Sequence, residues 1–463
     1  MMRPGEVDRL IADYRAGRMD GDAIAAVLRQ RATGSAPIPL NQSQLGLFAL
    51  ERQGRGGYAV SAAFALEGVG FEAFKGAYEA VVRRWPVLGG KVAMDGDGLH
   101  LVPNPAGVAI EWRDARGLSR AARMDALQRE RWAATDLMNG PFARALYLAG
   151  EEGEALALIT GHHIVLDGRS MSLIVEAFAQ HFASPGAPVT PVDAALYRQA
   201  VRAEHDREEG SEGNARLAHW RRVLDCPPQP ALVPADGGTP GAPAASLVRA
   251  LSPELTARLD DFSAQNGLFT TTVLMAVWQG LLARLSNQPD VIVGLPVEQR
   301  EVTTSDLVGN FISVMPVRLV CGADPMRAVL RRLQGEILDG MGALLSYPRL
   351  IAGLGRSGQR ELLASALFFD DAAGRMTEAV AGVPGVSLLD GFRQEGPFPL
   401  FLQIGRTATE AGNQYNIRIG YDGILYSRDR IDYLLSQYLL LLCGVIERPE
   451  LGLFEHDLTG GEA

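Results

Sequence analysis

The chain has 463 residues, of which 47% are hydrophobic and 21% charged, and its formal net charge is -10. This length favours two lobes over one ordinary core, and the composition is that of a soluble globular protein without a membrane span or a secretory signal. The negative charge argues against a nucleic-acid partner, and three widely spaced cysteines, Cys226, Cys321 and Cys443, are typical of reduced, buried thiols in a cytoplasmic protein.

Residues 1–35 stand apart from the rest of the chain. Residues 6–16, which Gly17 closes, and residues 20–31, which open on Asp20 in an N-cap position, predict two short amphipathic helices. Two interpretations of this N-terminal extension stay open. It is either packed against the body of the protein or is a docking element for a partner protein.

The next region, residues 36–185, is predicted to form the first lobe. Within it, the apolar residues 155–160 predict a buried strand, and the sequence GHHIVLDGRS follows at residues 161–170. Functional side chains often lie where a strand enters a loop. Adjacent side chains on an extended backbone point to opposite sides, so one of His162 and His163 should face a cleft and the other the packed interior. Imidazole can exchange a proton near neutral pH.

A Pro-rich connection at residues 184–191 separates this region from a second lobe, residues 186–463. The patterns there predict a charged helix, two further helices, a strand, an alternating strand and an apolar helix. In chain order these are residues 197–224, 253–266, 271–286, 290–293, 416–421 and 428–447.

Several other motifs do not indicate function. The GLGRSG sequence at residues 353–358 fits a dinucleotide-binding pattern but follows no strand, so it is predicted to be a loop. The chain has no G-x-S-x-G nucleophile elbow, no C-x-x-C and no histidines at metal-ligand spacing, and therefore no metal site is expected.

The HHxxxDG pattern at residues 162–168 resembles the core motif of the condensation domains of nonribosomal peptide synthetases and hybrid polyketide systems, within the chloramphenicol-acetyltransferase-like superfamily. The resemblance continues to residue 174, where DGRSMSLI is similar to the DGxSMxxL extension. Five further blocks of the family occur in order, which makes the resemblance highly specific. They are PLNQSQLGLF, AVVRRWPVL, TDLMNGPFARA, VGLPVEQR and VGNFISVMPVR, at residues 39–48, 80–88, 135–145, 293–300 and 308–318.

Three of these blocks depart from the family pattern. Trp85 and Pro86 replace the His-Glu centre of the second block, Gln299 replaces a glycine, and Ser313-Val314 replaces Asn-Thr. The last two lie near the expected cleft, so recognition of the acceptor cannot be carried over from the family.

The resemblance implies a V-shaped α/β pseudo-dimer of two chloramphenicol-acetyltransferase-like lobes with a central cleft. It implies that an acyl group moves from the phosphopantetheine thioester of an acyl or peptidyl carrier protein to an amine or hydroxyl, giving an amide or ester, with chain release as one use. The acceptor is either on a second carrier or a soluble amine or alcohol. The chain has no carrier-type serine motif and no room for an adenylation domain, so both substrates are expected from elsewhere. We expect a cytoplasmic monomer with no bound cofactor and no nucleic-acid or membrane partner.

Roles for individual residues follow from the same resemblance. His163 is expected to face the cleft as base or orienting group, with His162 positioning it from the core. Asp167 is expected to be structural, with Arg300 or Arg318 as its partner across the lobes, because a buried carboxylate needs compensation. The backbone N–H of Gly168 would approach the oxyanion. Ser313, Arg300 and Arg318 are the candidate substrate-binding residues.

Four alternative functions stand beside this one. An epimerisation domain shares the motif but typically has a tryptophan soon after it, where this chain has Met171, which argues against that type. A heterocyclisation domain replaces the histidine pair by aspartate, so His162 and His163 exclude it. A coenzyme A-dependent acyltransferase of the same superfamily and a catalytically silent domain that recruits carrier proteins both stay open.

Overall fold

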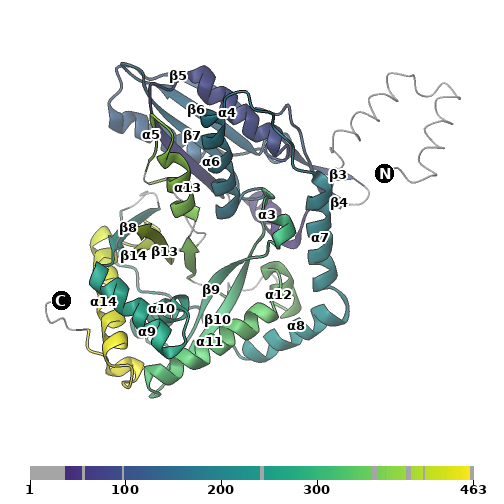
Figure 1. Cartoon of the computed structure of the whole chain (residues 1–463). Coiled ribbons are helices and arrows are strands. Elements are labelled where there is room, and N and C mark those ends of the chain that lie inside the picture. The colour runs from purple at the N-terminus through teal and green to yellow at the C-terminus, as the bar shows by residue number, and fades with distance from the viewer. Residues whose placement is uncertain are drawn as a thin grey trace, which may run out of the picture.

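The computed structural model describes residues 37–54, 58–95, 98–239, 244–356, 362–363, 365–370, 372–389, 391–392, 398–409 and 412–458. These residues form a mixed α/β structure with several β-sheets, arranged as two lobes joined by helices (Figure 1). The mixed α/β class expected from the sequence is therefore confirmed. The expected helices of residues 1–35 lie outside the described residues.

A five-stranded sheet forms the centre of the first lobe. Its strands follow the order β12 (Val386–Leu388), β2 (Ala59–Glu67), β7 (Glu154–His162), β6 (Ala143–Ala149) and β5 (Ile110–Asp114). Both faces are covered: α4 (Phe71–Arg84) and α6 (Gly168–Ala183) pack on one face, and α5 (Arg120–Arg131) packs on the other. Strand β7 can therefore be apolar along almost its whole length.

Helix α3 (Gln42–Arg52) begins at a capping box that precedes the first sheet. The Asn41 side chain accepts a hydrogen bond from the Gln44 N–H (2.8 Å), and the Gln44 side chain accepts one from the Asn41 N–H (2.9 Å). This reciprocal pair satisfies two donors that a helix start otherwise leaves without partners. A small sheet of order β1 (Ile38–Pro39), β4 (Gly98–Val102) and β3 (Lys91–Asp95) lies nearby in sequence.

Two helices, rather than the single helix expected over residues 197–224, lead from the first lobe toward the second. Helix α7 (Ala194–Glu208) ends before Gly210, which has a φ of +70°, and α8 (Gly210–Val223) continues in a new direction (Figure 1). A positive φ is available to glycine at little cost and breaks the helical repeat. The single-helix prediction was wrong at this point.

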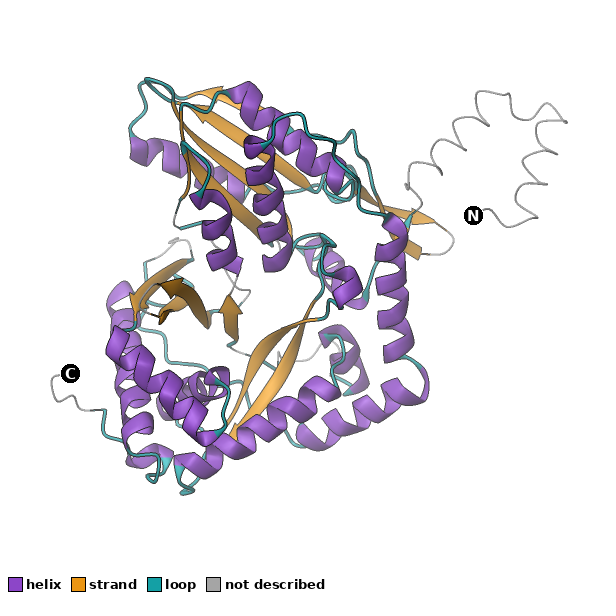
Figure 2. Cartoon of the chain, in the orientation of Figure 1, coloured by secondary structure: helices purple, strands orange, loops and turns teal. Residues whose placement is uncertain are grey.

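The second lobe contains a four-stranded sheet and the β9–β10 hairpin, surrounded by helices (Figure 2). The sheet order is β11 (Leu367–Asp370), β13 (Leu400–Thr409), β14 (Gly412–Tyr421) and β8 (Ala245–Ala250); the hairpin is β9 (Asp290–Glu298) and β10 (Ile312–Val320). Its helices are α9 (Pro253–Asn266), α10 (Thr270–Ser286), α11 (Met326–Gly342), α12 (Tyr347–Gly353) and α14 (Arg428–Glu447). The helices and strands expected in this region are confirmed, although the strands are longer than predicted.

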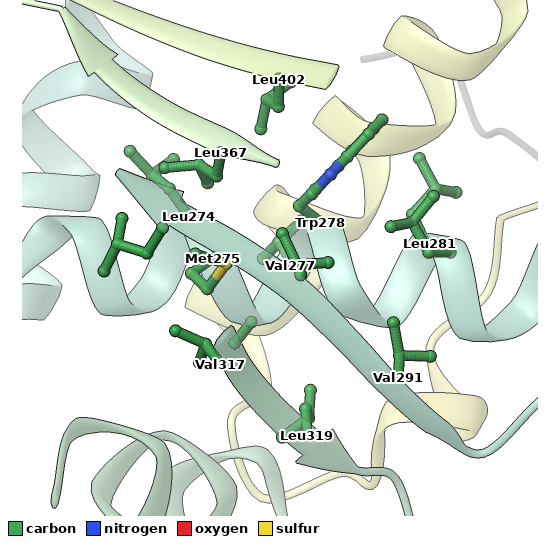
Figure 3. Packing of buried hydrophobic residues seen from close by; sticks show 14 of the residues in the cluster. Leu274, Met275, Val277, Trp278, Leu281, Val291, Val317, Leu319, Leu367 and Leu402 are labelled. Carbon is green, nitrogen blue, oxygen red and sulfur yellow. The ribbon is translucent and has the colours of Figure 1, made fainter. Parts of the chain in front are cut away.

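The core of the second lobe is built around α10, whose side chains are buried on nearly every face. Leu274 and Trp278 contact the sheet side, while Val291 and Val317 approach from the hairpin (Figure 3). The Trp278 indole N–H donates to the Ser365 hydroxyl (3.0 Å), so this large side chain buries no unpaired donor.

The two lobes interlock because part of the second half of the sequence joins the first lobe. Helix α13 (Ala372–Ala381) packs against α6, and β12 pairs antiparallel with β2, with Val386 opposite Leu66 (Figure 1). The structure thus adds residues 372–388 to the body that the sequence assigned to residues 36–185.

Two expectations about the chain as a whole can be compared with the described residues. Cys321 is buried and Cys443 half-buried, but Cys226 is exposed, so the expectation of three buried thiols was wrong for Cys226, which has a φ of +44° in a turn. No single described helix is long and apolar enough to cross a membrane; α9 and α10 meet that test only as a pair bent by 107°.

The packing of α10 predicts that Leu274→Ala destabilises the protein by about 2–5 kcal/mol, because it leaves a cavity in a dense core. Leu274 is fully buried, whereas Leu338 on α11 is 47% exposed. Urea unfolding measures both, with Leu338→Ala as the matched control. Equal losses for the two variants would contradict the assigned core.

Candidate active site

The histidine pair lies where β7 ends. His162 is the last residue of the strand and is buried, whereas His163 begins the turn that leads to α6 and is half-buried. The His162 N–H donates to the Phe142 carbonyl (2.9 Å), and the His163 N–H donates to the Tyr58 carbonyl (2.8 Å). These backbone bonds attach His162 to the segment before β6 and His163 to the segment before β2.

The His162 ring is directed away from solvent. Its Nδ1 accepts a hydrogen bond from the Ile164 N–H (3.0 Å), and its Nε2 lies 3.3 Å from Glu51 Oε1 on α3. Burial, with a smaller contribution from His163, lowers the pKa of His162 to about 3. The ring is therefore neutral near pH 7.

The environment of His163 also favours the neutral ring. Burial lowers its pKa, and the negative charge of Asp167 and backbone groups of His163 and Leu166 act in the opposite direction without cancelling the shift. A neutral imidazole has a lone pair that can accept a proton, which is the property required of a general base.

Asp167 is fully buried and forms the N-cap of α6. Its Oδ1 accepts from the Ser170 N–H (2.8 Å), its Oδ2 accepts from the Phe311 N–H (3.0 Å), and both oxygens accept from the Arg300 guanidinium (3.0 and 2.8 Å). Burial acts to raise the pKa of Asp167, but the charge and hydrogen bonds of Arg300 and the two backbone donors lower it overall. The carboxylate is ionised and fully engaged.

Arg300 follows β9 in the second lobe, and its side chain is only 3% exposed. Besides Asp167, its guanidinium contacts acceptors on both lobes: the Leu307 carbonyl (3.0 Å), Glu298 Oε1 (2.9 Å), the Ser170 hydroxyl (2.9 Å) and the Gly309 carbonyl (3.1 Å). The guanidinium carbon also lies 4.7 Å from the centre of the Phe311 ring. The Asp167–Arg300 pair is thus a fully bonded contact between the lobes.

Gly168 is the first residue of α6, so the helix itself does not use its backbone N–H. A Cβ at this position would lie 3.6 Å from the Cβ of Ala372, an ordinary van der Waals contact. Packing therefore does not demand glycine here.

The structure does not bring the remaining two predicted residues to this group. Ser313 on β10 is 1% exposed, and its hydroxyl donates to the Leu345 carbonyl (2.7 Å). Arg318, farther along β10, pairs with Asp290 (2.7 Å) and donates to the Val223 carbonyl (2.8 Å). Of the two arginines proposed as partners for Asp167, Arg300 is the one that meets it.

Two polar residues of the site were not singled out from the sequence. Buried Gln44 donates from Nε2 to the Ile164 carbonyl (2.7 Å) and to the Tyr197 hydroxyl (2.9 Å), which connects α3, the histidine turn and α7. The Asn-x-x-Gln capping pattern at residues 41–44 was the available signal for Gln44. Glu51, whose carboxylate faces His162, gave no such signal.

Two cavities lie near these residues. One cavity of about 400 Å³ has mostly apolar walls, including Trp85, Pro86 and Val308. The polar groups of its two large aromatic residues are already bonded: the Trp85 indole N–H donates to the Asp306 carbonyl, and the Tyr197 hydroxyl accepts from Gln44. A small one of about 30 Å³ lies beside His162 and Glu51. His163 lines neither of them, so the cleft that His163 is expected to face stays a prediction. In the described part of the chain, no three His, Cys, Asp or Glu side chains are grouped to hold a metal ion.

Comparison with protein families finds one match that covers nearly the whole chain. Residues 35–462 match the family described as "Condensation domain". The chain is 27% identical over 441 residues to polyketide synthase PksN of Bacillus subtilis (strain 168), and 27% identical over 449 residues to phosphinothricin tripeptide synthetase PhsB of Streptomyces viridochromogenes. Each alignment covers 91% of this chain but only 8% of PksN and 36% of PhsB, so the chain spans well under half the length of either relative.

Solved structures show the same fold at low sequence identity. The X-domain from teicoplanin biosynthesis, in complex with OxyB, superposes with a TM-score of 0.78 at 20% identity and covers 92% of this chain and 97% of that chain. The condensation domain of the monacolin K polyketide synthase MokA gives a TM-score of 0.72 at 17% identity, covering 90% and 99%. The chloramphenicol-acetyltransferase-like fold expected from the sequence is confirmed.

The bonding of Asp167 predicts that Asp167→Ala costs about 3–5 kcal/mol of stability, because the buried Arg300 loses its carboxylate. Chemical denaturation measures the loss. Asp290→Ala, which breaks the more exposed pair with Arg318, is the control and should cost less. An Asp167→Ala protein that is as stable as wild type but inactive would indicate that Asp167 takes part in the reaction itself.

Proposed function

The chain belongs to the condensation-domain family, and on this basis we propose that it catalyses an acyl-transfer reaction. In this reaction, an acyl group arrives as a thioester on the phosphopantetheine arm of a carrier protein and passes to an amine or hydroxyl acceptor. The product is an amide or an ester. The observation that carries the proposal is the neutral, half-buried His163 on the turn between β7 and α6, next to the contact between the lobes.

Each bond change has an assigned group. The acceptor nitrogen or oxygen attacks the thioester carbonyl, and His163 accepts the proton that the acceptor loses. The negative charge that develops on the carbonyl oxygen is stabilised by the Gly168 N–H at the start of α6, where the helix dipole also favours a negative charge. The tetrahedral species then collapses, the carbon–sulfur bond breaks, and the thiolate takes the proton from His163.

The protein contributes differently for the two acceptors. An α-amine has a pKa of about 7.7–8.0, so a useful fraction is already neutral and needs mainly positioning. A hydroxyl is hardly ionised and must lose its proton as it attacks. We assign no substrate contact to Arg300, Arg318 or Ser313, because protein groups already engage these side chains.

Carrier proteins are the partners that this proposal requires. The donor is an acyl or peptidyl carrier protein, and the acceptor is either a second carrier-bound unit or a soluble amine or alcohol that releases the chain. The reaction needs no bound cofactor beyond these phosphopantetheine arms. We place it in the cytoplasm, with the protein acting as a monomer.

A second candidate is a recruiting domain without chemistry. It is favoured by the likeness to the teicoplanin X-domain, a protein of the same fold that was solved in complex with OxyB. The test is mass spectrometry of acylated carrier proteins incubated with this protein and a panel of amines and alcohols, with acyl-coenzyme A as a parallel donor. Product from carrier donors supports the proposal, product from acyl-coenzyme A alone supports a coenzyme A-dependent acyltransferase, and carrier binding without product supports recruitment.

His163→Ala should reduce single-turnover transfer on one acyl-carrier donor by about 10²–10⁴-fold for a hydroxyl acceptor, which is the usual range for loss of a general base. The loss for an amine acceptor should be smaller, because a neutral amine is already nucleophilic. Equal losses would mean that His163 orients the acceptor rather than accepting its proton. Unchanged rates would remove His163 from the mechanism.

The lowered pKa of His163 gives a second prediction. The base must be neutral, so activity is present above the pKa of His163 and lost as the pH falls through it. With a hydroxyl acceptor, which does not itself titrate there, the acid limb of the single-turnover rate should lie below the ordinary histidine value of about 6.5. A limb at or above 6.5 would contradict the assignment.

A further inference from the structure

We propose that Glu51 is a positioning residue for the reaction, and that it acts by fixing the His162 ring that supports the turn carrying His163. This inference rests on the proposed function, because it assigns a role within that reaction. It concerns a carboxylate on α3 to which the proposed reaction assigns no bond change and which contacts His162 rather than a reacting group.

The first step is the proton position on His162. The Ile164 N–H donates to Nδ1 (3.0 Å), so Nδ1 must present a lone pair. Because burial keeps the ring neutral, its one proton is on Nε2. The backbone thus selects a single tautomer of His162.

The second step is the partner of that proton. Nε2 lies 3.3 Å from Glu51 Oε1, somewhat longer than a usual charge-assisted hydrogen bond, and among the described residues neither Nε2 nor Glu51 Oε2 has a hydrogen-bond partner of normal geometry. His162 is 4% exposed, so its ring is largely removed from bulk water. A carboxylate facing a buried N–H is the arrangement that orients a histidine ring in many sites.

Two arginines near Glu51 bond to other groups. Arg131 and Arg144 line the same small cavity, but Arg144 bonds to Glu130 (2.7 Å) and Thr135 (3.0 Å). Arg131 donates to the Gly391 carbonyl (3.3 Å). The contact of Glu51 with His162 Nε2 is the one that joins this carboxylate to the histidine turn.

The third step links this pair to His163. Glu51 and Gln44 are seven residues apart on α3, and thus on the same face of the helix. Gln44 holds the Ile164 carbonyl, while Glu51 faces the His162 ring that accepts the Ile164 N–H. Helix α3 consequently holds the histidine turn on both sides of His163. Loss of one contact frees the turn without removing any reacting group.

The test compares Glu51→Ala and Glu51→Gln. Without a carboxylate or amide, the turn should relax, and kcat for carrier-dependent transfer should fall about 10–10²-fold, the scale of a displacement of about 1 Å. KM for the acyl carrier should stay near the wild-type value. Glu51→Gln should recover most of the activity, because its amide oxygen can take the position that Glu51 Oε1 holds opposite Nε2. Adding Glu51→Ala to His162→Ala should cause no further loss. Glu72→Ala, at an exposed glutamate on α4, is the matched control.

Activity of Glu51→Ala near the wild-type value would overturn the proposal, as would a Glu51→Gln variant as impaired as Glu51→Ala. A second readout does not depend on turnover. The chain has seven histidines, so ¹⁵N-histidine labelling with a His162→Ala reference identifies the His162 signals. In wild type we expect a neutral His162 ring protonated on Nε2. In both Glu51 variants we expect the ¹⁵N signals of this ring to shift. An Nδ1–H ring in wild type would also overturn the inference. If wild type transfers no acyl group, the proposed function fails, and the ring signals still decide the role of Glu51.

Discussion

The contact on which the site depends is the buried ion pair between Asp167 and Arg300. Each charge would be costly to bury alone, and each is compensated because the carboxylate receives four hydrogen bonds and the guanidinium meets acceptors from both lobes. The pair fixes two things at once: the start of α6, through the N-cap of Asp167, and the position of the second lobe relative to it. The turn that carries His163 ends at the start of α6. The position of this turn therefore depends on the contact between the lobes.

Burial, which makes it necessary to compensate the charges of Asp167 and Arg300, also determines the protonation state of the two histidines. Removal from water disfavours a charged imidazole, which lowers the pKa values of His162 and His163. For His162 the result is one fixed tautomer between a backbone donor and a carboxylate. For His163 it is a lowered pKa, which favours the neutral ring. Burial thus favours the neutral form of both His162 and His163, although the proposed roles of the two side chains differ.

The sequence predicted the elements whose patterns are local. The apolar periodicity of residues 428–447, preceded by a serine cap at Ser427, corresponds to α14 from end to end, and the run before the histidines is part of β7. What it could not give were contacts between distant segments. Arg300 and Arg318 were equivalent by sequence, and only the geometry after β9 assigns Arg300 to Asp167. Glu51 is the lone acidic residue of α3, and no sequence pattern connects it to His162. The Glu-Gly step at residues 209–210 was visible, but its left-handed backbone decides that α7 and α8 are separate helices.

Strand β12 comes from the second half of the sequence but belongs to the sheet of the first lobe. This limits how the lobes of two relatives can be combined in one chain. Strand β12 pairs with residues 64–66 of β2; without β12, the backbone donors and acceptors of this part of β2 would form an open, apolar edge. Such edges pair with other chains and promote aggregation. A chimera between relatives that replaces the first lobe therefore has to take residues 372–388 from the same parent, although they follow most of the second lobe in the sequence.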